Sequence, residues 1–281
     1  ASLLIVFAMS IEEFGTPAAL ASRTGFEVLV TGIYTRLSDW PIDLSGAALG
    51  SVILMLMVVA AFVLQNWIAT RRSYISQTGK PGDMSKADLG YWRWPVLGLF
   101  ALVALIGVVI PLAAIAVTSV TGTISGGLKW SNFDLRHYEP IFRSGSRAWH
   151  AMMTSGWLAV LTAFATAAIG GLVAYIVVRG TGRGRAVMDG LSVLPNAIPA
   201  IVLAVGIILF WNSPYQPVSL YGTAAILLIA YIGILLPYPI RYAVARLRQI
   251  SGSLDDAARV AGASQMQALR HVTLPLMAPS L

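Results

Sequence analysis

The stretch SLDDAARVAGASQMQALRHVTLP, residues 253–275, carries two short helix patterns between apolar runs. Ser253 and Asp256 have the spacing of a capping box, which predicts a helix start. Gly262 suits the end of that helix, because glycine adopts a positive φ without strain. One face of the predicted helix carries residues that recur at helical spacing: Leu254, Ala257, Ala258 and Ala261. These side chains are mostly alanine, so the face is small and smooth.

We call residues 253–275 the cassette. The second part of the cassette repeats the capping pattern. Ser264 and Gln267 predict a second helix start. Three apolar residues then lie on one side of the predicted helix: Met266, Leu269 and Val272. We expect Pro275 to end this helix, because proline lacks the backbone donor that the helix needs.

The order Asp256-Ala257-Ala258, three residues, Gly262, nine residues and Val272-Thr273-Leu274-Pro275 resembles a known motif. It is similar to the EAA loop of bacterial ABC-importer permeases, E-A-A-x3-G-x9-I-x-L-P. Asp for Glu and Val for Ile are the two departures. The resemblance implies an all-α, polytopic transmembrane helical bundle of the MetI-like permease type, with a cytoplasmic coupling-helix loop. The alternative is a helical hairpin without a special role.

The resemblance also implies what the cassette residues do. Ser253 and Asp256 would set the helix start, the alanines would form the face that docks on an ATPase subunit, and Gly262 and Pro275 would set the turn and the exit. The expected coupling residues are Ser253, Asp256, Ala257, Ala258, Gly262, Leu274 and Pro275. None of these roles is catalytic, and ATP hydrolysis is expected on a separate ATPase subunit.

Composition places the chain in a membrane. Of its 281 residues, 57% are hydrophobic and 11% charged, whereas a soluble domain carries about 25% charged residues. The chain has no cysteine, and its three histidines lie far apart. We therefore expect no cofactor and no metal site.

Apolar runs predict the membrane spans. Residues 45–64, 95–120 and 151–178 are each long enough to cross a bilayer, which takes about 20 residues. Residues 190–240 carry no charge and are too long for one helix, so the polar cluster at 212–217 should divide them into two spans. Residues 1–11 read as the end of a further span, and we expect the chain to be truncated at both ends.

Basic residues predict the orientation. With alternating sides, 13 of the 19 Lys and Arg residues fall on the side that holds the cassette. The positive-inside rule makes that side cytoplasmic. The net charge of +7 is thus a topology signal, and we expect no nucleic-acid partner.

A finer resemblance concerns four segments within residues 14–94. The segments FGTP at 14–17, TGIY at 31–34, TGK at 78–80 and DLGYWRW at 88–94 resemble fused, two-half iron(III)-type permeases. This implies that residues 1–69 are the tail of a first permease half, 70–94 a cytoplasmic linker and 95–281 a second half. The implied cargo is iron(III), with phosphonate, thiamine or polyamine as alternatives within the same permease type.

A proline pair predicts a broken helix. Pro195 and Pro199 flank Asn196 at the start of a span, and proline removes a hydrogen bond and clashes with the preceding turn. Broken helices at membrane depth occur where they are packed in protein or line a cavity. The segment is either part of the pathway or gate, or an ordinary proline kink.

The resemblance implies cytoplasmic ABC ATPase subunits, a periplasmic or extracellular substrate-binding protein and the lipid bilayer as partners, in a bacterial inner membrane. A membrane-embedded enzyme or receptor is the alternative class. It lacks support, because no pair of ionisable residues lies deep within a span. Six residues outside the spans could suggest iron ligands: Tyr34, Trp40, Trp130, His137, Tyr138 and Glu139. We reject this interpretation, because the aromatic ones fit an interfacial belt and because, in the importers that the chain resembles, an external binding protein captures the substrate.

Overall fold

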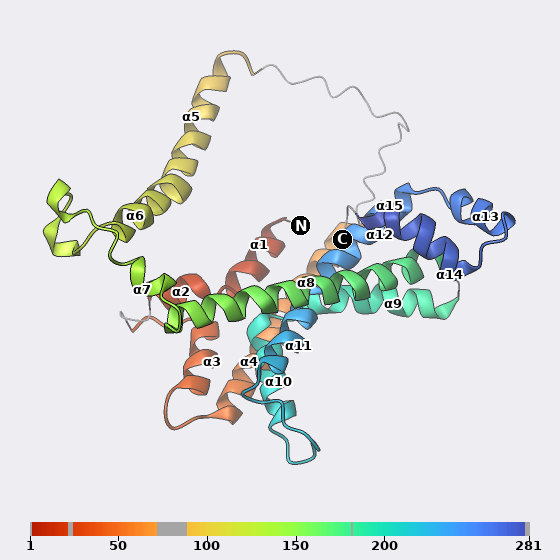
Figure 1. The fold of residues 1–281 in the computed structure, drawn as a ribbon, viewed down its shortest axis with the longest axis horizontal. Coiled ribbons are helices and arrows are strands. Elements are labelled where there is room, and N and C mark those ends of the chain that lie inside the picture. Colours follow the sequence, from red (N-terminus) through yellow and green to blue (C-terminus); the bar gives the residue numbers. More distant parts are fainter. Residues whose placement is uncertain (1, 22–24, 72–88, 181, 279–281) are drawn as a thin grey trace. The chain divides into compact units, whose positions relative to one another are not determined.

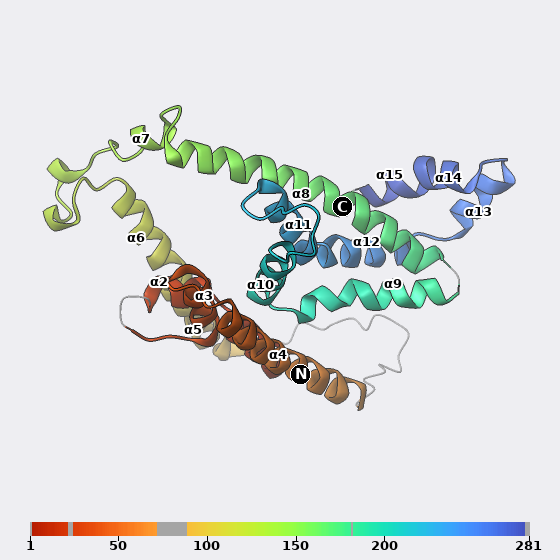
Figure 2. The same cartoon turned by 90° about the horizontal axis from the view of Figure 1, so that it is seen from below.

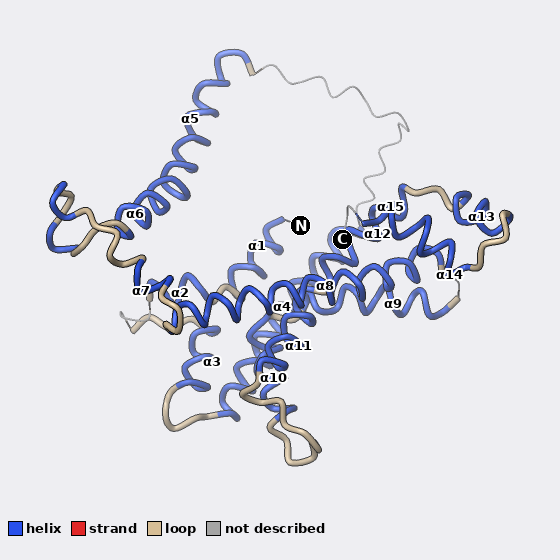
Figure 3. Tube along the Cα trace, viewed as in Figure 1, coloured by secondary structure: helices blue, strands red, loops and turns tan. Residues whose placement is uncertain are grey.

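The computed structural model describes residues 2–21, 25–71, 89–180 and 182–278. Within these residues the chain is built from helices and loops, without a regular strand (Figure 3). The all-α prediction is therefore confirmed. The chain divides into two compact units, one of residues 1–73 with 158–281 and one of residues 74–157. The predicted 70–94 linker lies mostly outside the described residues.

Three described helices are long and apolar enough to cross a membrane. They cover Leu44–Ile68, Gly90–Ser119 and Arg147–Arg179, close to three of the predicted spans. At 1.5 Å per residue, even the shortest of them is about 37 Å long, which exceeds the hydrocarbon thickness of about 30 Å. A fourth span is possible from a bent pair, Ala224–Leu235 with Pro237–Gln249.

The N-terminal part of the first unit is a packed group of helices (Figure 1). It consists of α1 (Ser2–Ile11), α2 (Gly15–Leu20), α3 (Leu29–Ser38) and α4 (Leu44–Arg71). Val30 and Ile33 of α3 are buried against Ala47, Leu54 and Val58 of α4. A Cβ atom at Gly50 would lie 2.9 Å from Ile33 Cγ1, so this glycine lets the two helices come together.

The C-terminal part of the first unit begins within α8 (Arg147–Arg179). It contains α9 (Arg183–Val193), α10 (Ala200–Trp211), α11 (Ala224–Leu235) and α12 (Pro237–Gln249). A Cβ atom at Gly170 of α8 would lie 3.1 Å from Pro239 Cβ and 3.2 Å from Ile240 N, so glycine permits the close approach of α8 and α12. Ala174, Ala243, Leu247 and Met277 form the buried cluster beside it.

The predicted proline break is present, and a second break lies at Pro237. The short turn η5 (Leu194–Ala197) separates α9 from α10, and Pro199 caps α10 with a non-helical ψ of 141°. The break at Pro195 and Pro199 is thus confirmed. α11 and α12 meet at an angle of 40° at Pro237, which is fully buried.

Pro111 and Pro275 share a local geometry that the sequence did not predict. Each follows a π-helical turn and one further residue: η2 (Leu105–Val109) precedes Ile110, and η6 (Leu269–Thr273) precedes Leu274. A π turn shifts the hydrogen bonds by one residue, so the helix passes the proline, which has no N–H to donate. The prediction that Pro275 ends its helix is therefore wrong: α15 (Leu274–Met277) continues through it.

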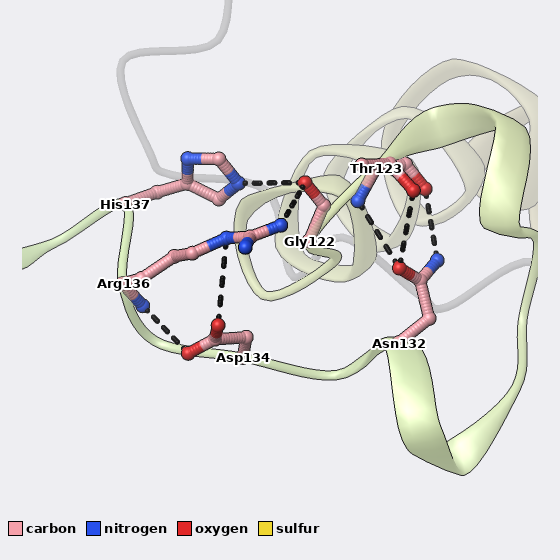
Figure 4. A network of polar contacts seen from close by, with 6 residues as sticks. All are labelled: Gly122, Thr123, Asn132, Asp134, Arg136 and His137. Atoms are coloured by element: carbon pink, nitrogen blue, oxygen red, sulfur yellow. Dashed lines mark hydrogen bonds and ion pairs between the residues drawn. The ribbon is translucent and has the colours of Figure 1, made fainter.

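The second unit holds a helix and a compact loop. The helix runs from η1 (Gly90–Trp92) and α5 (Arg93–Ala104) through η2 into α6 (Ile110–Ser119). The loop at 120–146 contains η3 (Ile124–Gly126), η4 (Trp130–Asn132) and α7 (Glu139–Phe142). Figure 4 shows how the side chains of this 120–146 loop hold its own backbone: Asn132 bonds to Thr123, and Arg136 and His137 both reach the carbonyl of Gly122.

Candidate functional site

The cassette is a pair of helices beside the C-terminal end of α8. Its first helix is α13 (Ser253–Val260), and its second runs from α14 (Gln265–Ala268) through η6 into α15. Figures 1 and 2 both place α13 and α14 next to the ends of α8 and α9. Met277 at the end of the second helix is fully buried with Ala174 of α8 and Leu247 of α12. The cassette is thus seated on the spans at one end and projects at the other.

The start of α13 differs from the prediction. Gly252, not Ser253, is the N-cap residue, and no side chain caps the helix. The chain is already turning at Ser251, whose carbonyl accepts a hydrogen bond from Leu254 N. Ser253 therefore lies inside the first turn, one position too late for a capping box with Asp256, and its hydroxyl instead contacts the hydroxyl of Ser251 at 2.7 Å. The predicted Ser253–Asp256 capping box is wrong.

The turn between the two cassette helices agrees with the sequence. Gly262 has a φ of +92°, and its N–H donates to Arg259 O while Ala263 N–H donates to Ala258 O. These two bonds are those of a Schellman motif, which glycine favours. Ser264 and Gln267 then bond reciprocally, at 2.8 Å and 3.3 Å, and confirm the second predicted capping box.

One buried polar cluster fastens the cassette to α8. Arg179, the last residue of α8, places Nε 3.1 Å from Asp255 Oδ2 and donates from Nη2 to the carbonyl of Ile250 at 2.8 Å. Thr273, at the end of η6, donates to the other carboxylate oxygen of Asp255 at 2.5 Å. The side chains of Arg179 and Asp255 are only 20% and 16% exposed. We call Arg179, Asp255, Thr273 and the Ile250 carbonyl the anchor cluster.

The opposite face of the cassette is open. Asp256, Ala257 and Arg259 are exposed, Ala258 is half-buried, and Val260 is 89% exposed. A shallow hollow lies on this face, lined by Asp256, Arg259, Val260, Ala263 and Ser264. The hollow thus combines the exposed apolar side chain of Val260 with a negative charge from Asp256 and a positive charge from Arg259. Another protein can cover a surface of this kind.

The other predicted site residues lie in two places. Leu274 and Pro275 are exposed at the far end of the cassette's second helix. Pro199 is buried, and Pro195 lines a small cavity together with Ser192 of α9 and Pro237 of α12. Both proline breaks therefore border one cavity. The side chain of Asn196 lies outside what the structure describes.

Sequence reasoning did not find the anchor cluster. Arg179 counted only as a positive charge at the end of a span, and neither Asp255 nor Thr273 belongs to the E-A-A-x3-G-x9-I-x-L-P pattern. A usable signal was present, because Asp255 is a second carboxylate directly beside the patterned Asp256. Its partner, Arg179, could not be found from spacing alone, since it lies far away in the sequence at the end of another helix.

Two of the residues considered as iron ligands make other contacts. His137 Nε2 lies 3.3 Å from the Gly122 carbonyl, and Tyr138 donates to the hydroxyl of Ser119 at 2.7 Å. Within the described parts of the chain, no group of three His, Cys, Asp or Glu residues comes together to hold a metal ion.

Comparison with known families and proteins identifies the C-terminal region. Residues 166–281 match the family described as "Binding-protein-dependent transport system inner membrane component". The matched region includes the last 14 residues of α8, both proline breaks and the whole cassette. Together with the apolar helices, it makes the chain an all-helical, multi-pass inner-membrane protein.

Related proteins extend the similarity to the whole chain. The ferric transport system permease protein FbpB of Actinobacillus pleuropneumoniae is 30% identical over 289 residues, which cover all of this chain and 40% of the relative. A second relative is FbpB 1 of Haemophilus influenzae, whose name also places it in a ferric transport system. It is 30% identical over 285 residues, which cover all of this chain and 44% of the relative. This chain thus spans less than half the length of these relatives.

A third relative aligns over less of the chain. PhnV of Salmonella typhi, whose name places it in a 2-aminoethylphosphonate transport system, is 30% identical over 174 residues. This alignment covers 60% of the chain and 63% of the relative. The similarity to the phosphonate permease is therefore partial, while that to the ferric permeases includes the N-terminal helices.

Proposed function

We propose that this chain is part of the transmembrane permease of an ATP-driven ABC importer, and that it forms a translocation pathway and couples it to a separate ATPase. The observation that carries the proposal is the cassette, which is tied to the end of α8 by the Arg179–Asp255 ion pair on one side and exposed on the other. A coupling element needs both properties, because it must be gripped by a partner and must move the spans. ATP hydrolysis belongs to that partner, on the cytoplasmic side.

The cargo that the comparisons favour is iron(III). The two relatives named for ferric transport align with the full chain, whereas the relative named for 2-aminoethylphosphonate aligns with 60% of it. A substrate-binding protein on the outer side would deliver the cargo. Phosphonate, thiamine and polyamine remain the alternative cargoes.

The same comparison supports a proposal for the domain organisation. The chain matches less than half of each ferric relative, and the family match begins at residue 166. We infer that residues 1–69 are the tail of a first permease half, that 70–94 form a linker and that 95–281 form most of a second half. α1 to α4 would then be the spans and outer loop that follow the cassette of the first half.

The pathway segment is the pair of proline breaks. α10 has 12 residues, about 18 Å at 1.5 Å per residue, which is too short to cross a bilayer alone. Pro195 from one break and Pro237 from the other border the same cavity of about 170 Å³. We assign Pro195, Asn196 and Pro199 to the wall or gate of the pathway, where a movement of α12 can reach them.

Uptake by the full-length protein tests both parts of this proposal. The protein is reconstituted into liposomes with its ATPase and binding protein, and entry of radioactive iron(III) is measured with and without internal ATP. ATP-dependent iron entry supports the proposal, and competition by 2-aminoethylphosphonate, thiamine or spermidine would instead identify another cargo. Iron(III) entry at the same rate with and without internal ATP would contradict the importer assignment.

A further inference from the structure

Asp255 joins three separate segments of the chain. Its Oδ2 atom pairs with Arg179 at the end of α8, and its Oδ1 atom accepts the proton of Thr273 from η6. Asp255 itself belongs to the first turn of α13. One carboxylate thus ties together a membrane-length helix and both helices of the cassette.

The ion pair within the anchor cluster is buried. Arg179 Nε and Asp255 Oδ2 each expose less than 1 Å², and neither atom has a hydrogen bond elsewhere in the described residues. The two atoms are partners only through their ion pair at 3.1 Å. Removal of one partner would leave the other charge buried without compensation, which is far more costly than loss of an exposed pair.

The path of the chain into the cassette is fitted around Arg179. The guanidinium donates to the carbonyl of Ile250, and a Cβ atom on Gly252 would lie 3.1 Å from Nη1. Residues 250–252 therefore pass close to the guanidinium, which would have to shift by a few tenths of an ångström if residue 252 carried a Cβ atom. The planar fork of arginine can hold a carbonyl and a carboxylate at once, which the point charge of a lysine cannot.

The two neighbouring carboxylates of the cassette have opposite environments. Asp255 is turned inward to the anchor cluster, whereas Asp256 is exposed beside the hollow with Arg259 and Val260. The EAA pattern includes Asp256 and omits Asp255. Asp256 therefore lies where a partner protein can contact it. Asp255 lies where it can transmit a movement of the cassette to α8.

We propose that Asp255 is a positioning residue, which makes the cassette and the end of α8 move as one body. This inference rests on the proposed importer function. Force applied by the ATPase to the exposed face reaches α13, passes through the Asp255–Arg179 pair to α8, and passes through Thr273 to the second helix. Without this link the ATPase still binds the cassette, but its movement shifts only the cassette and does not reach α8.

The ratio of ATP hydrolysed to cargo transported tests the inference. Full-length protein is reconstituted with its ATPase and binding protein, and hydrolysis and radioactive iron(III) uptake are measured in the same vesicles. We expect Asp255→Asn and Thr273→Val to raise this ratio about fivefold or more, the low end of ordinary coupling between sites. The amount of ATPase assembled per permease should stay within twofold of native. An unchanged ratio in both variants overturns the inference.

A double variant separates positioning from simple stability. Arg179→Met with Asp255→Asn leaves no buried charge, so it should assemble better than Asp255→Asn alone while the ratio stays raised. Recovery of the native ratio in the double variant would mean that the pair serves stability only and would overturn the inference.

The matched control lies in the 120–146 loop. Arg136→Met with Asp134→Asn removes an exposed Arg–Asp pair and should leave the ratio native. If the native complex itself shows no ATP-driven uptake, the importer proposal fails. If the native complex couples and the Asp255 and Thr273 variants couple equally well, only the positioning role fails.

Discussion

Two segments outside the spans, the cassette and the 120–146 loop, are each stabilised by an Arg–Asp ion pair, but the pairs differ in kind. Arg136 and Asp134 lie 3.4 Å apart with half-exposed side chains, and the bonds around them join residues at most 19 positions apart. Arg179 and Asp255 are buried, and Arg179 also reaches a carbonyl 71 residues away. The loop is therefore held by bonds within itself and to the adjoining end of α6, while the cassette is held by a span that is distant in the sequence. Only the second arrangement can transmit a movement.

The largest effect should follow loss of the buried pair. Asp255→Asn strands the Arg179 charge, and breaking a buried pair costs about 3–5 kcal/mol. Because both side chains retain some exposure, we expect about 2–3 kcal/mol here. Arg136→Gln should cost less than about 1 kcal/mol, as exposed pairs do. Thermal unfolding of the two detergent-solubilised variants measures the difference, and equal losses would remove the contrast between the segments.

The position of the cassette depends on close packing between α8 and α12, the two helices beside it. Gly170→Leu would push a side chain against Pro239 and the backbone at Ile240, at a cost of about 1–3 kcal/mol for overpacking. Gly156→Leu in the same helix is the matched control, because a Cβ atom there meets nothing within 4 Å. We expect the Gly170 variant to unfold at a lower temperature and the control to behave as native. The reverse order would contradict the packing described.

A smaller effect should come from the local turn of the cassette. Gly262→Ala forces a residue with a Cβ atom to a φ of +92°, which costs roughly 1–2 kcal/mol. Gly190→Ala is the control, since this glycine lies within α9 at an ordinary φ with open space around it. Protection of amide hydrogens in α13 and α14 should fall in the first variant and hold in the second. Unchanged protection in Gly262→Ala would show that the turn does not limit the cassette.

The smallest effect concerns a third, local pair. Asp43 accepts from Gly46 N–H and from Arg36, and the Gly46 hydrogen bond, followed by Arg36, holds the pKa of its carboxyl below the ordinary value of 3.8. A lowered folded pKa stabilises the fold above that value, and the contribution is lost as pH falls through the folded pKa. Asp43→Asn should remove this slight acid sensitivity below about pH 4. A pH titration of the unfolding temperature measures it, and an identical acid slope in the variant would contradict the assignment.

Features with local causes were predictable from the sequence. Span positions follow from apolar length, the turn at Gly262 and the Ser264–Gln267 box follow from short-range spacing, and the break at Pro199 follows from the chemistry of proline. The start of α13 was mispredicted by one residue, because Ser251 begins the turn before Ser253 does. The helix passes Pro275 because a π turn absorbs the missing hydrogen bond. The anchor cluster was out of reach, since its members meet only when α8 and the cassette pack together.

The most direct test of the account is a crosslink from the exposed face of the cassette. Residues 1–281 contain no cysteine, so one introduced cysteine in this region can be labelled selectively with a photoreactive maleimide, and the parent protein gives the background. A label at Ala257→Cys should crosslink the full-length permease to its ATPase in membranes, and a label at Ala19→Cys, on exposed α2, should not. A crosslink from Ala19 and none from Ala257 would contradict the claim that the cassette is the ATPase coupling surface.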